Sequence, residues 1–474
     1  MKKYDLIVIG GGAGGLTAAA GGANFGAKVA LIDKASFGGD CLWTGCVPTK
    51  SLIQSAKIVQ TAKKASHLFD LEVRGVPNFK AARDRLNESI ATIQKHDDDQ
   101  RFIDMGIDVY HGSATFKNEN EIKINGETTI KGKRIVIATG SRPMIPPIDG
   151  IKETGYLTNE TALQLDKQPE SLLVVGGGPI GLEFAQSFTR FGTKVTVVEM
   201  GATILGKEDS DLVPYVIDSL KSEGVQFITG AKVVKTALTS AVKEVTIEQN
   251  DQQFVLKFDE ILLASGRVPN SDKLELENTD IKTNRGYITV NKKLQTSVPH
   301  IYAIGDVNGY YPFTHKAGYE GKLVVSNAVF GLKRNADYTN LPWVTYTDPE
   351  LFHLGLTEEE ARKSGKKIKV YKTPLDDVDR FVSDHETKGL IKIIADEKGV
   401  ILGAHAVGPG AGDFMQEVVF AKQFGHKIGS ISNVIHPYPT HVGGVQRTAD
   451  LYWREKLASS SIMNVLKNYV KWFR

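Results

Sequence analysis

The feature that most restricts the fold of this chain is a glycine-rich unit that occurs twice. In the first copy, an apolar run at 6–9 precedes glycines at GxGxxG spacing, an alanine-rich helix at 16–25 and a second strand at 28–32 that ends at Asp33. The three glycines are Gly10, Gly12 and Gly15. Such glycines let a pyrophosphate approach a helix N-terminus, and the terminal carboxylate accepts ribose hydroxyls. The unit therefore predicts a dinucleotide site.

The second copy begins with an apolar strand at 172–175 and ends with a strand at 194–198 that Glu199 closes. Its glycines are Gly176, Gly178 and Gly181. Two complete units predict two bound dinucleotides. The Glu199 carboxylate accepts hydrogen bonds from a ribose and repels a 2′-phosphate, and residues 200–205 contain no arginine. The sequence thus favours NADH over NADPH at the second site.

A short stretch at 38–50 contains the only two cysteines of the chain, Cys41 and Cys46, between a glycine pair and a proline. Two thiols this close in sequence can form a small, easily reduced disulfide ring. Residues 47–50 resemble the first turn of a helix, and a helix N-terminus favours a thiolate. Because the stretch directly follows the first unit, and a nicotinamide does not ordinarily exchange electrons with a disulfide, we expect a flavin dinucleotide there.

Length and composition are those of an ordinary globular protein. The chain has 474 residues, 41% of them hydrophobic and 24% charged, which suggests about three domains. The formal net charge of +3, without a long basic run, argues against nucleic acid as a partner. No secretory signal or apolar run of membrane-spanning length is visible, so we expect a cytoplasmic protein. In a reducing compartment, two cysteines indicate catalysis.

The remaining segments continue the pattern. Residues 51–105 have helical spacing, and a strand-rich segment follows to about residue 133. A buried strand with a glycine turn and a proline occurs at 134–143 and again at 261–270. Asp306 follows a strand at 301–304 and suits a ribitol hydroxyl or a plain helix cap. Glu183 either serves the dipole of its helix or pairs with Lys50.

These stretches together resemble the FAD-dependent pyridine nucleotide-disulfide oxidoreductases, the group that contains lipoamide dehydrogenase, glutathione reductase and mercuric reductase. The resemblance covers essentially the whole chain and implies an α/β fold with two Rossmann-like domains, for FAD and NAD, and an α+β dimerisation domain. It implies an FAD domain at 1–149 and 272–340, an NAD(P)H domain at 150–271, a dimerisation domain at 341–460 and a C-terminal helix at 461–474. The dimerisation domain is indicated by 347–350, 387–389 and 402–405.

The resemblance also implies roles for single residues. NADH would reduce the flavin, and the flavin would reduce the Cys41–Cys46 disulfide, with Cys46 against the flavin and Cys41 toward the substrate. Lys50 paired with Glu183 would flank flavin N5, and the active site of a homodimer would be completed by the partner subunit. We assign no resident metal. FAD contacts are implied for Gly10, Gly12, Gly15, Asp33, Lys34, Gly39, Thr139, Gly140 and Asp306, NAD contacts for Gly176, Gly178, Ile180 (the nicotinamide gate), Gly181 and Glu199, and a cofactor contact for Gly266.

The C-terminal motif departs from the family. A histidine–glutamate dyad normally supplies the proton for the leaving thiol, but Tyr438 stands at the histidine position and Gly443 at the glutamate position. Tyr438 and His436 are the candidate catalytic residues of this motif. His436 or His441 could substitute for the missing histidine, but each is displaced by two or three residues, and a structural role is favoured for His436. Mercuric reductases also carry the tyrosine, yet they use a second cysteine pair that this chain lacks. In the redox stretch, Asp40 and Trp43 replace the usual threonine and asparagine and should alter access to Cys41.

Three functions follow for testing. The first is an FAD-dependent reductase that passes electrons from NADH through Cys41 and Cys46 to a small-molecule or metal-ion acceptor that needs no positioned proton donor, such as a metal ion, a quinone, a reactive oxidant or a disulfide. The second keeps the fold but passes electrons from the flavin directly to a quinone or oxygen. The third is a redox sensor or scaffold flavoprotein whose dithiol reports oxidation.

The segment 461–474 is predicted to form a basic amphipathic helix. Ile462, Val465, Leu466, Tyr469, Trp472 and Phe473 share one face, whereas Asn464, Lys467, Asn468, Lys471 and Arg474 share the other. No acidic residue interrupts the segment. Such a helix can lie in a membrane interface, so peripheral contact with the inner face of the membrane is one hypothesis. Packing of the apolar face on the dimer is the alternative.

Overall fold

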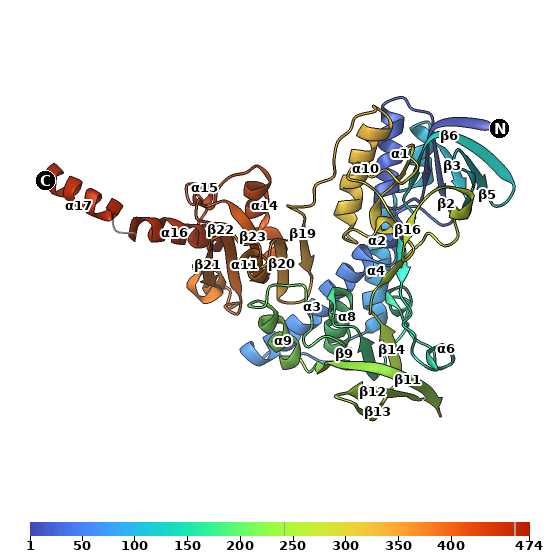
Figure 1. Cartoon of the computed structure of the whole chain (residues 1–474). Coiled ribbons are helices and arrows are strands. Elements are labelled where there is room, and N and C mark those ends of the chain that lie inside the picture. Colours follow the sequence, from blue (N-terminus) through green and yellow to red (C-terminus); the bar gives the residue numbers. More distant parts are fainter. Residues whose placement is uncertain (241, 459–460) are drawn as a thin grey trace. The chain divides into compact units, whose positions relative to one another are not determined.

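The computed structural model describes residues 1–240, 242–458 and 461–474 and divides into two compact units (Figure 1). The first unit contains residues 1–200 and 230–337. The second contains residues 201–229 and 338–474, so the segment that follows Glu199 belongs to the same unit as the C-terminal part of the chain.

The first unit is built around a parallel sheet with the order β3-β2-β1-β6. The long strand β6 pairs with β18 in parallel at its carboxyl end and with β5 in antiparallel at its amino end. The buried, β-branched run in β1 explains this position, because both faces of a parallel strand are covered. The strands are β1 Lys2–Ile9, β2 Val29–Asp33, β3 Asp108–His111, β4 Ala114–Asn118, β5 Glu121–Ile124, β6 Thr128–Ile137 and β18 Ile301–Ala303.

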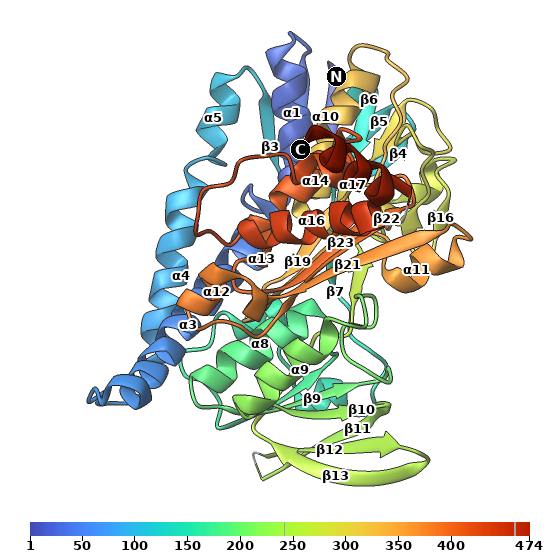
Figure 2. The same cartoon turned by 90° about the vertical axis from the view of Figure 1, so that its left-hand side faces the viewer.

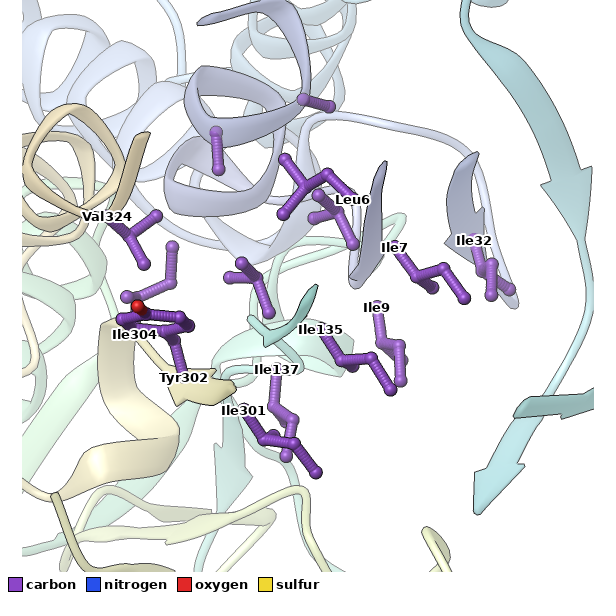
Figure 3. Packing of buried hydrophobic residues seen from close by; sticks show 14 of the residues in the cluster. Leu6, Ile7, Ile9, Ile32, Ile135, Ile137, Ile301, Tyr302, Ile304 and Val324 are labelled. Atoms are coloured by element: carbon purple, nitrogen blue, oxygen red, sulfur yellow. The ribbon is translucent and has the colours of Figure 1, made fainter. Parts of the chain in front are cut away.

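Helices cover this sheet and extend from it. Helices α1 and α10 pack against each other, as do the long helices α3 and α4 (Figure 2). Figure 3 shows the core on both faces of the sheet: Leu6 and Val324 lie on the side of α1 and α10, and the isoleucines of β1, β6 and β18 lie together on the opposite side. The helices are α1 Ala13–Asn24, α2 Gly39–Trp43, α3 Cys46–Phe69, α4 Phe79–Gln94, α5 Asp99–Asp104 and α10 Thr314–Ala328, with a 3₁₀ turn at Gly305–Asn308.

A second parallel sheet, β9-β8-β14, belongs to the second glycine-rich unit, and α8 crosses from β8 to β9. Strands β7 and β15, which are distant in sequence, form an antiparallel pair that joins the two glycine turns that the sequence repeats, with Ser141 opposite Pro269. Bounds are β7 Ser141–Pro143, α6 Ile151–Thr154, α7 Asn159–Ala162, β8 Ser171–Val175, α8 Pro179–Arg190, β9 Lys194–Glu199, β11 Ala231–Thr239, β12 Val242–Gln249, β13 Gln252–Phe258, β14 Glu260–Leu263, β15 Arg267–Pro269, β16 Thr283–Asn284 and β17 Tyr287–Ile288.

The second unit is a five-stranded antiparallel sheet, β19-β20-β23-β22-β21, with helices packed on its buried face. Its strands are β19 Pro342–Thr345, β20 Glu350–Gly355, β21 Ile368–Pro374, β22 Leu390–Asp396 and β23 Ile401–Gly408. Its helices are α9 Val213–Ser222, α11 Glu358–Lys363, α12 Asp379–Ser383, α13 Ala411–Phe414, α14 Gln416–Gln423, α15 Ile428–Ile431, α16 Gly443–Ala458 and α17 Ser461–Phe473.

One polar row crosses all five strands of this sheet at neighbouring register positions: Trp343, His353, His405, Lys392 and Lys372. The segment 208–211 lies on the row, because Glu208 bonds Trp343 and His353 while Lys392 lies 2.8 Å from Asp209. Buried polar groups are tolerated only when they are paired, and here the acidic segment pairs them. The row therefore joins residues 201–229 to the sheet.

Candidate active site

Both glycine-rich units adopt the same backbone geometry. Gly10 and Gly176 have φ angles of +112° and +115°, which favour glycine. A Cβ on Gly15 would lie 1.9 Å from the Gly10 carbonyl oxygen, and one on Gly181 would lie 2.1 Å from that of Gly176. These four positions require glycine for packing of the helix against the strand.

The middle glycines differ from the others, because little protein surrounds them. A Cβ on Gly178 would meet no atom within 4 Å, and one on Gly12 would meet only the Gly39 Cα, at 3.9 Å. Each is the N-cap residue of a helix whose amide groups point outward, at α1 and α8. This open space against two helix N-termini fits the pyrophosphates of FAD and NAD(P)H.

The two closing carboxylates occupy equivalent positions. Asp33 accepts a hydrogen bond from the amide of Gly11, and Glu199 accepts one of 2.7 Å from the amide of Gly177. Each carboxylate thus fixes its glycine loop through the amide that follows the first glycine. The other oxygen of Asp33 accepts a hydrogen bond of 2.8 Å from the Ala35 amide. Lys34, next to Asp33, is exposed.

The repeated glycine turns meet beside the first unit. Thr139 Oγ1 donates to the Asn270 carbonyl oxygen at 2.7 Å, and the Asn270 amide donates to the Gly140 carbonyl oxygen at 3.0 Å. Gly140 and Gly266 both have positive φ angles, +69° and +143°. Asp306 lies nearby in the 3₁₀ turn, where its carboxylate accepts a hydrogen bond of 2.6 Å from the Ser141 hydroxyl.

The two cysteines lie at the start of adjacent helices, Cys41 in the one-turn helix α2 and Cys46 at the first position of α3. The preceding Gly39 contacts the first dinucleotide loop directly, because a Cβ on it would lie 2.8 Å from the Gly12 Cα. Both cysteines are thiols in this structure. These positions agree with the prediction that the redox stretch begins a helix and lies next to the first glycine-rich unit.

The thiols have opposite ionisation tendencies. A hydrogen bond from Cys41, with help from Thr314 and Lys50, lowers the pKa of the Cys46 thiol to about 6. The same hydrogen bond, together with burial, raises the pKa of the Cys41 thiol. Cys46 Sγ lies 3.3 Å from Thr314 Oγ1 at the start of α10. Cys46 is therefore the thiol that carries the charge in the reduced pair.

Lys50, one turn into α3, forms an ion pair with Glu183 of α8 at 2.9 Å, and the Glu183 side chain is 7% exposed. The pair joins the redox helix to the helix of the second glycine unit. Of the two sequence hypotheses for Glu183, the structure favours the ion pair. Ile180, in the first turn of α8, has 36% of its surface exposed.

The C-terminal loop holds its histidines with acidic partners. His436 Nε2 lies 2.8 Å from Glu417 and its Nδ1 lies 3.0 Å from the Val434 carbonyl, so both ring nitrogens are engaged. His441 Nε2 lies 2.8 Å from Asp384. Tyr438, by contrast, is 80% exposed, and its hydroxyl donates to Asp379 at 3.1 Å. That bond raises the pKa of Tyr438, so the phenol stays protonated.

Sequence reasoning missed two side chains at this site. Thr314 contacts Cys46 from a helix far along the chain, and Arg267 contacts both Asp40 and the Ser141–Asp306 pair. A threonine before a helix and an arginine after a glycine turn are common surface features, so the residues alone gave no signal. The recurrence of the glycine turn at 261–270 was the one available hint for Arg267.

This fold and site define a class: proteins with two dinucleotide cradles, of which one adjoins a cysteine pair. The model of the family described as "pyridine nucleotide-disulphide oxidoreductase" matches residues 4–321, and the model of the dimerisation domain of the same family matches residues 341–449. The chain belongs to this family of flavoprotein disulfide oxidoreductases, which are FAD-dependent enzymes that act with NAD(P)H. The expected fold class is confirmed.

Individual relatives differ in their names. The chain is 36% identical to a dihydrolipoyl dehydrogenase of Bacillus subtilis, over 92% of this chain and 95% of the relative. It is 34% identical to a mercuric reductase of Staphylococcus aureus, over 94% and 82%. The solved Cu(II) complex of the HOCl-induced flavoprotein disulfide reductase RclA from Escherichia coli is similar with a TM-score of 0.85 and 31% identity, over 95% and 100%.

Within the described ranges, none of the helices is long and apolar enough to cross a membrane. From residue 464 onward the side chains of the C-terminal helix α17 are exposed, with Val465 67%, Trp472 81% and Phe473 73% exposed. The side chain of Ile462, which the sequence places on the same face, lies outside the described residues.

Proposed function

We propose that this protein uses NADH and bound FAD to reduce an acceptor through Cys41 and Cys46, and that the acceptor does not depend on a histidine–glutamate dyad for its protons. The observation that carries the proposal is the combination of a low pKa at Cys46 with two histidines that are held by Glu417 and Asp384. A reactive thiol is present, whereas a histidine–glutamate dyad is replaced by Tyr438. A metal ion, a reactive oxidant or a reactive disulfide fits these residues.

The residues present fit both cofactors. FAD would lie on Gly10, Gly12, Gly15, Asp33, Lys34, Gly39, Thr139, Gly140 and Asp306, and NADH on Gly176, Gly178, Ile180, Gly181, Glu199 and Gly266. Bound FAD supplies a two-electron carrier between nicotinamide and disulfide. The Lys50–Glu183 pair would hold a positive charge beside that carrier, since Glu183 orients the ammonium at 2.9 Å. Glu199 favours NADH over NADPH because a 2′-phosphate beside a carboxylate is repelled.

The electron count is simple. A hydride from NADH supplies two electrons and one proton, which break the Cys41–Cys46 S–S bond and leave one thiol and one thiolate. Two electrons then leave this thiol–thiolate pair for the acceptor, the S–S bond re-forms and one proton is released. Cys41, whose thiol retains its proton, is assigned to the acceptor, and Cys46, the thiolate, to the cofactor side.

The assembly that we propose is a homodimer, because the chain carries the dimerisation domain of its family. The exposed Tyr438 would then meet Cys41 of the partner subunit and offer its proton to the acceptor site. We assign FAD to 1–149 and 272–340, NADH to 150–271, dimerisation to 341–460 and a separate role to 461–474.

The test compares anaerobic NADH oxidation by the wild type and by Cys41→Ser, with FAD content as the control for intact folding. Acceptors are small disulfides including lipoamide, Hg(II) and Cu(II), and soluble quinones. Loss of turnover with one acceptor class identifies the dithiol as the exit for electrons and that class as the substrate. Unchanged rates with all acceptors would overturn the proposal and support direct transfer from the flavin to a quinone.

We further propose that α17 makes a peripheral contact with an anionic membrane surface. Its apolar face carries Trp472 and Phe473, its polar face carries the cations Lys467, Lys471 and Arg474, and all five side chains are exposed. Sedimentation with anionic vesicles should carry down the full-length protein and leave a variant truncated after residue 458 in solution, and zwitterionic vesicles should bind neither. Equal sedimentation of both proteins with anionic vesicles would contradict the contact and favour packing of α17 on the dimer.

A further inference from the structure

The residue that precedes the first cysteine, Asp40, is part of an ion pair. Asp40 Oδ2 lies 3.1 Å from Nη2 of Arg267, which is 13% exposed at the start of β15. The other carboxylate oxygen of Asp40 accepts a hydrogen bond of 2.6 Å from the Thr44 hydroxyl. The side chain thus joins the redox helix α2 to the glycine turn at 261–270.

Asp40 also shapes the loop between the two cysteines. Its carbonyl oxygen accepts a hydrogen bond of 2.9 Å from the Thr44 amide, and a Cβ on Gly45 would lie 2.8 Å from that oxygen. Backbone and side chain of one residue therefore hold the same loop. Any movement of Asp40 displaces Cys41 on one side and the start of α3 on the other.

Arg267 lies between two carboxylates. Its Nε donates to Ser141 Oγ at 2.7 Å and lies 3.8 Å from Asp306 Oδ2, while Ser141 Oγ donates to Asp306. Its Nη2 also donates to the Ser141 carbonyl at 3.0 Å. One guanidinium thus spans the distance from the residue beside Cys41 to the carboxylate that we assign to FAD.

The sign of each charge determines its effect on the thiols. The Asp40 carboxylate raises the pKa of both cysteines, whereas Lys50 of α3 lowers that of Cys46. Further charged groups on elements packed here include Glu183 of α8, which pairs with Lys50, and Lys316 of α10, which pairs with Glu320. The titratable and exposed His315 follows Thr314 on α10, and α4, which packs on α2, carries charged side chains of both signs. Arg267 is the positive charge that opposes Asp40 and Asp306.

We propose that the ion pair between Asp40 and Arg267 positions the redox loop and sets how readily the Cys41–Cys46 disulfide accepts electrons. This inference rests on the proposed passage of electrons through that disulfide. Removing the negative charge stabilises the thiolate and hence the reduced state, so the disulfide becomes more oxidising. Removing the positive charge does the opposite. Asp40 and Arg267 are positioning residues, since neither exchanges electrons itself.

The test uses the FAD-bound protein without any acceptor, so that its outcome does not depend on the identity of the substrate. Asp40→Asn should raise the acid dissociation constant of the Cys46 thiol about threefold to tenfold, and Arg267→Gln should lower it by a similar factor. The double variant should return to within about twofold of the wild type. The thiolate is followed by ultraviolet absorbance against pH, and the dithiol by redox titration, in which a tenfold change in the equilibrium constant equals about 30 mV.

Two variants separate electrostatics from loosening of the structure. Asp272→Asn breaks the exposed pair that Arg142 of β7 makes with Asp272 at 3.0 Å, and it should leave both titrations unchanged. Arg267→Lys keeps the charge and should shift them less than Arg267→Gln, which covers the case in which the glutamine variant loses FAD. Shifts of the same sign for Asp40→Asn and Arg267→Gln, or no shift for Asp40→Asn, would overturn the proposal.

Discussion

Cys46 differs from an ordinary cysteine because donors surround it: the Cys41 thiol, the Thr314 hydroxyl and the Lys50 ammonium. Each stabilises the thiolate more than the thiol, and together they outweigh the cost of burying a charge. Of these three residues, Thr314 is the most informative one to mutate. It contacts Cys46 but is not a redox group.

We expect the reduced protein to react with iodoacetamide at Cys46 with an apparent midpoint near pH 6. The midpoint follows because the thiolate is the nucleophile and dominates above a pKa of about 6. Thr314→Val should move it upward by about half a unit, since one hydrogen bond to the thiolate is lost. Alkylation rates across pH, with the labelled site identified by peptide mapping, measure this. A midpoint near that of a free cysteine would contradict the assigned environment.

His405 is a second residue whose environment has a measurable consequence. Burial lowers its pKa to about 4, so the folded protein holds the neutral ring. The unfolded chain takes up a proton below about pH 6.5, which means that stability is complete above that pH and falls as the pH drops toward 4. We expect a loss of about 1 kcal/mol between about pH 7 and about pH 5.5. Denaturation midpoints of wild type and His405→Gln at both pH values test this, and an equal pH dependence of the two proteins would contradict it.

At the scale of elements, the two glycine units separate packing from ligand contact. Gly181 is required by the fold, because an added Cβ would strike the Gly176 carbonyl, whereas Gly178 faces open space. The spacing of the glycines predicted both units, but it could not show that the middle glycine has a different task from the other two. That distinction depends on which atoms approach from elsewhere in the chain.

We therefore expect Gly178→Ala to keep the FAD content and thermal midpoint of the wild type while weakening NADH binding at least tenfold. The added methyl group would occupy the place that we propose for a pyrophosphate, and it meets no protein atom within 4 Å. Gly181→Ala should lower the thermal midpoint as well. NADH titration under anaerobic conditions and differential scanning fluorimetry distinguish the two variants. An unchanged NADH affinity in Gly178→Ala would remove this glycine from the cofactor site.

Strands, helices and both cradles were predictable because each depends on residues that are close in sequence. Helix α3 begins at Cys46, β9 ends at Glu199 and α17 covers 461–473, near the predicted bounds. The Arg267 ion pair and the Thr314 contact were not predictable, since they depend on how distant segments pack. The polar row from Trp343 to Lys372 was missed for the same reason: its members alternate with apolar residues on separate strands.

At the scale of the whole molecule, the loop that carries Tyr438 and the loop that carries Cys41 lie in different units of one chain. The proposed homodimer would supply each active site with Cys41 from one subunit and Tyr438 from its partner. This arrangement can be tested by subunit exchange between two variant homodimers, one changed at Cys41 and the other at Tyr438.

Cys41→Ser and Tyr438→Phe homodimers should each be impaired, the second by about tenfold. When equal amounts are mixed under subunit-exchange conditions, about half of the dimers become mixed and one of their two sites is intact, so that activity should recover to about one quarter of the wild type. Acceptor-dependent NADH oxidation before and after exchange measures the recovery. Activity that stays at the average of the two variants would show that both residues act within one subunit.

The hydrogen bond from the Gly177 amide to Glu199 limits how this protein could evolve. An arginine in place of Glu199 would attract a 2′-phosphate through its positive charge. The loss of Glu199 would also remove the hydrogen-bond acceptor that holds the glycine loop. A lineage that shifted from NADH to NADPH would first need a substitute for that acceptor elsewhere in the loop. Descendants should therefore change the two positions together, and engineers who exchange the carboxylate alone should obtain a weaker binder of both nucleotides.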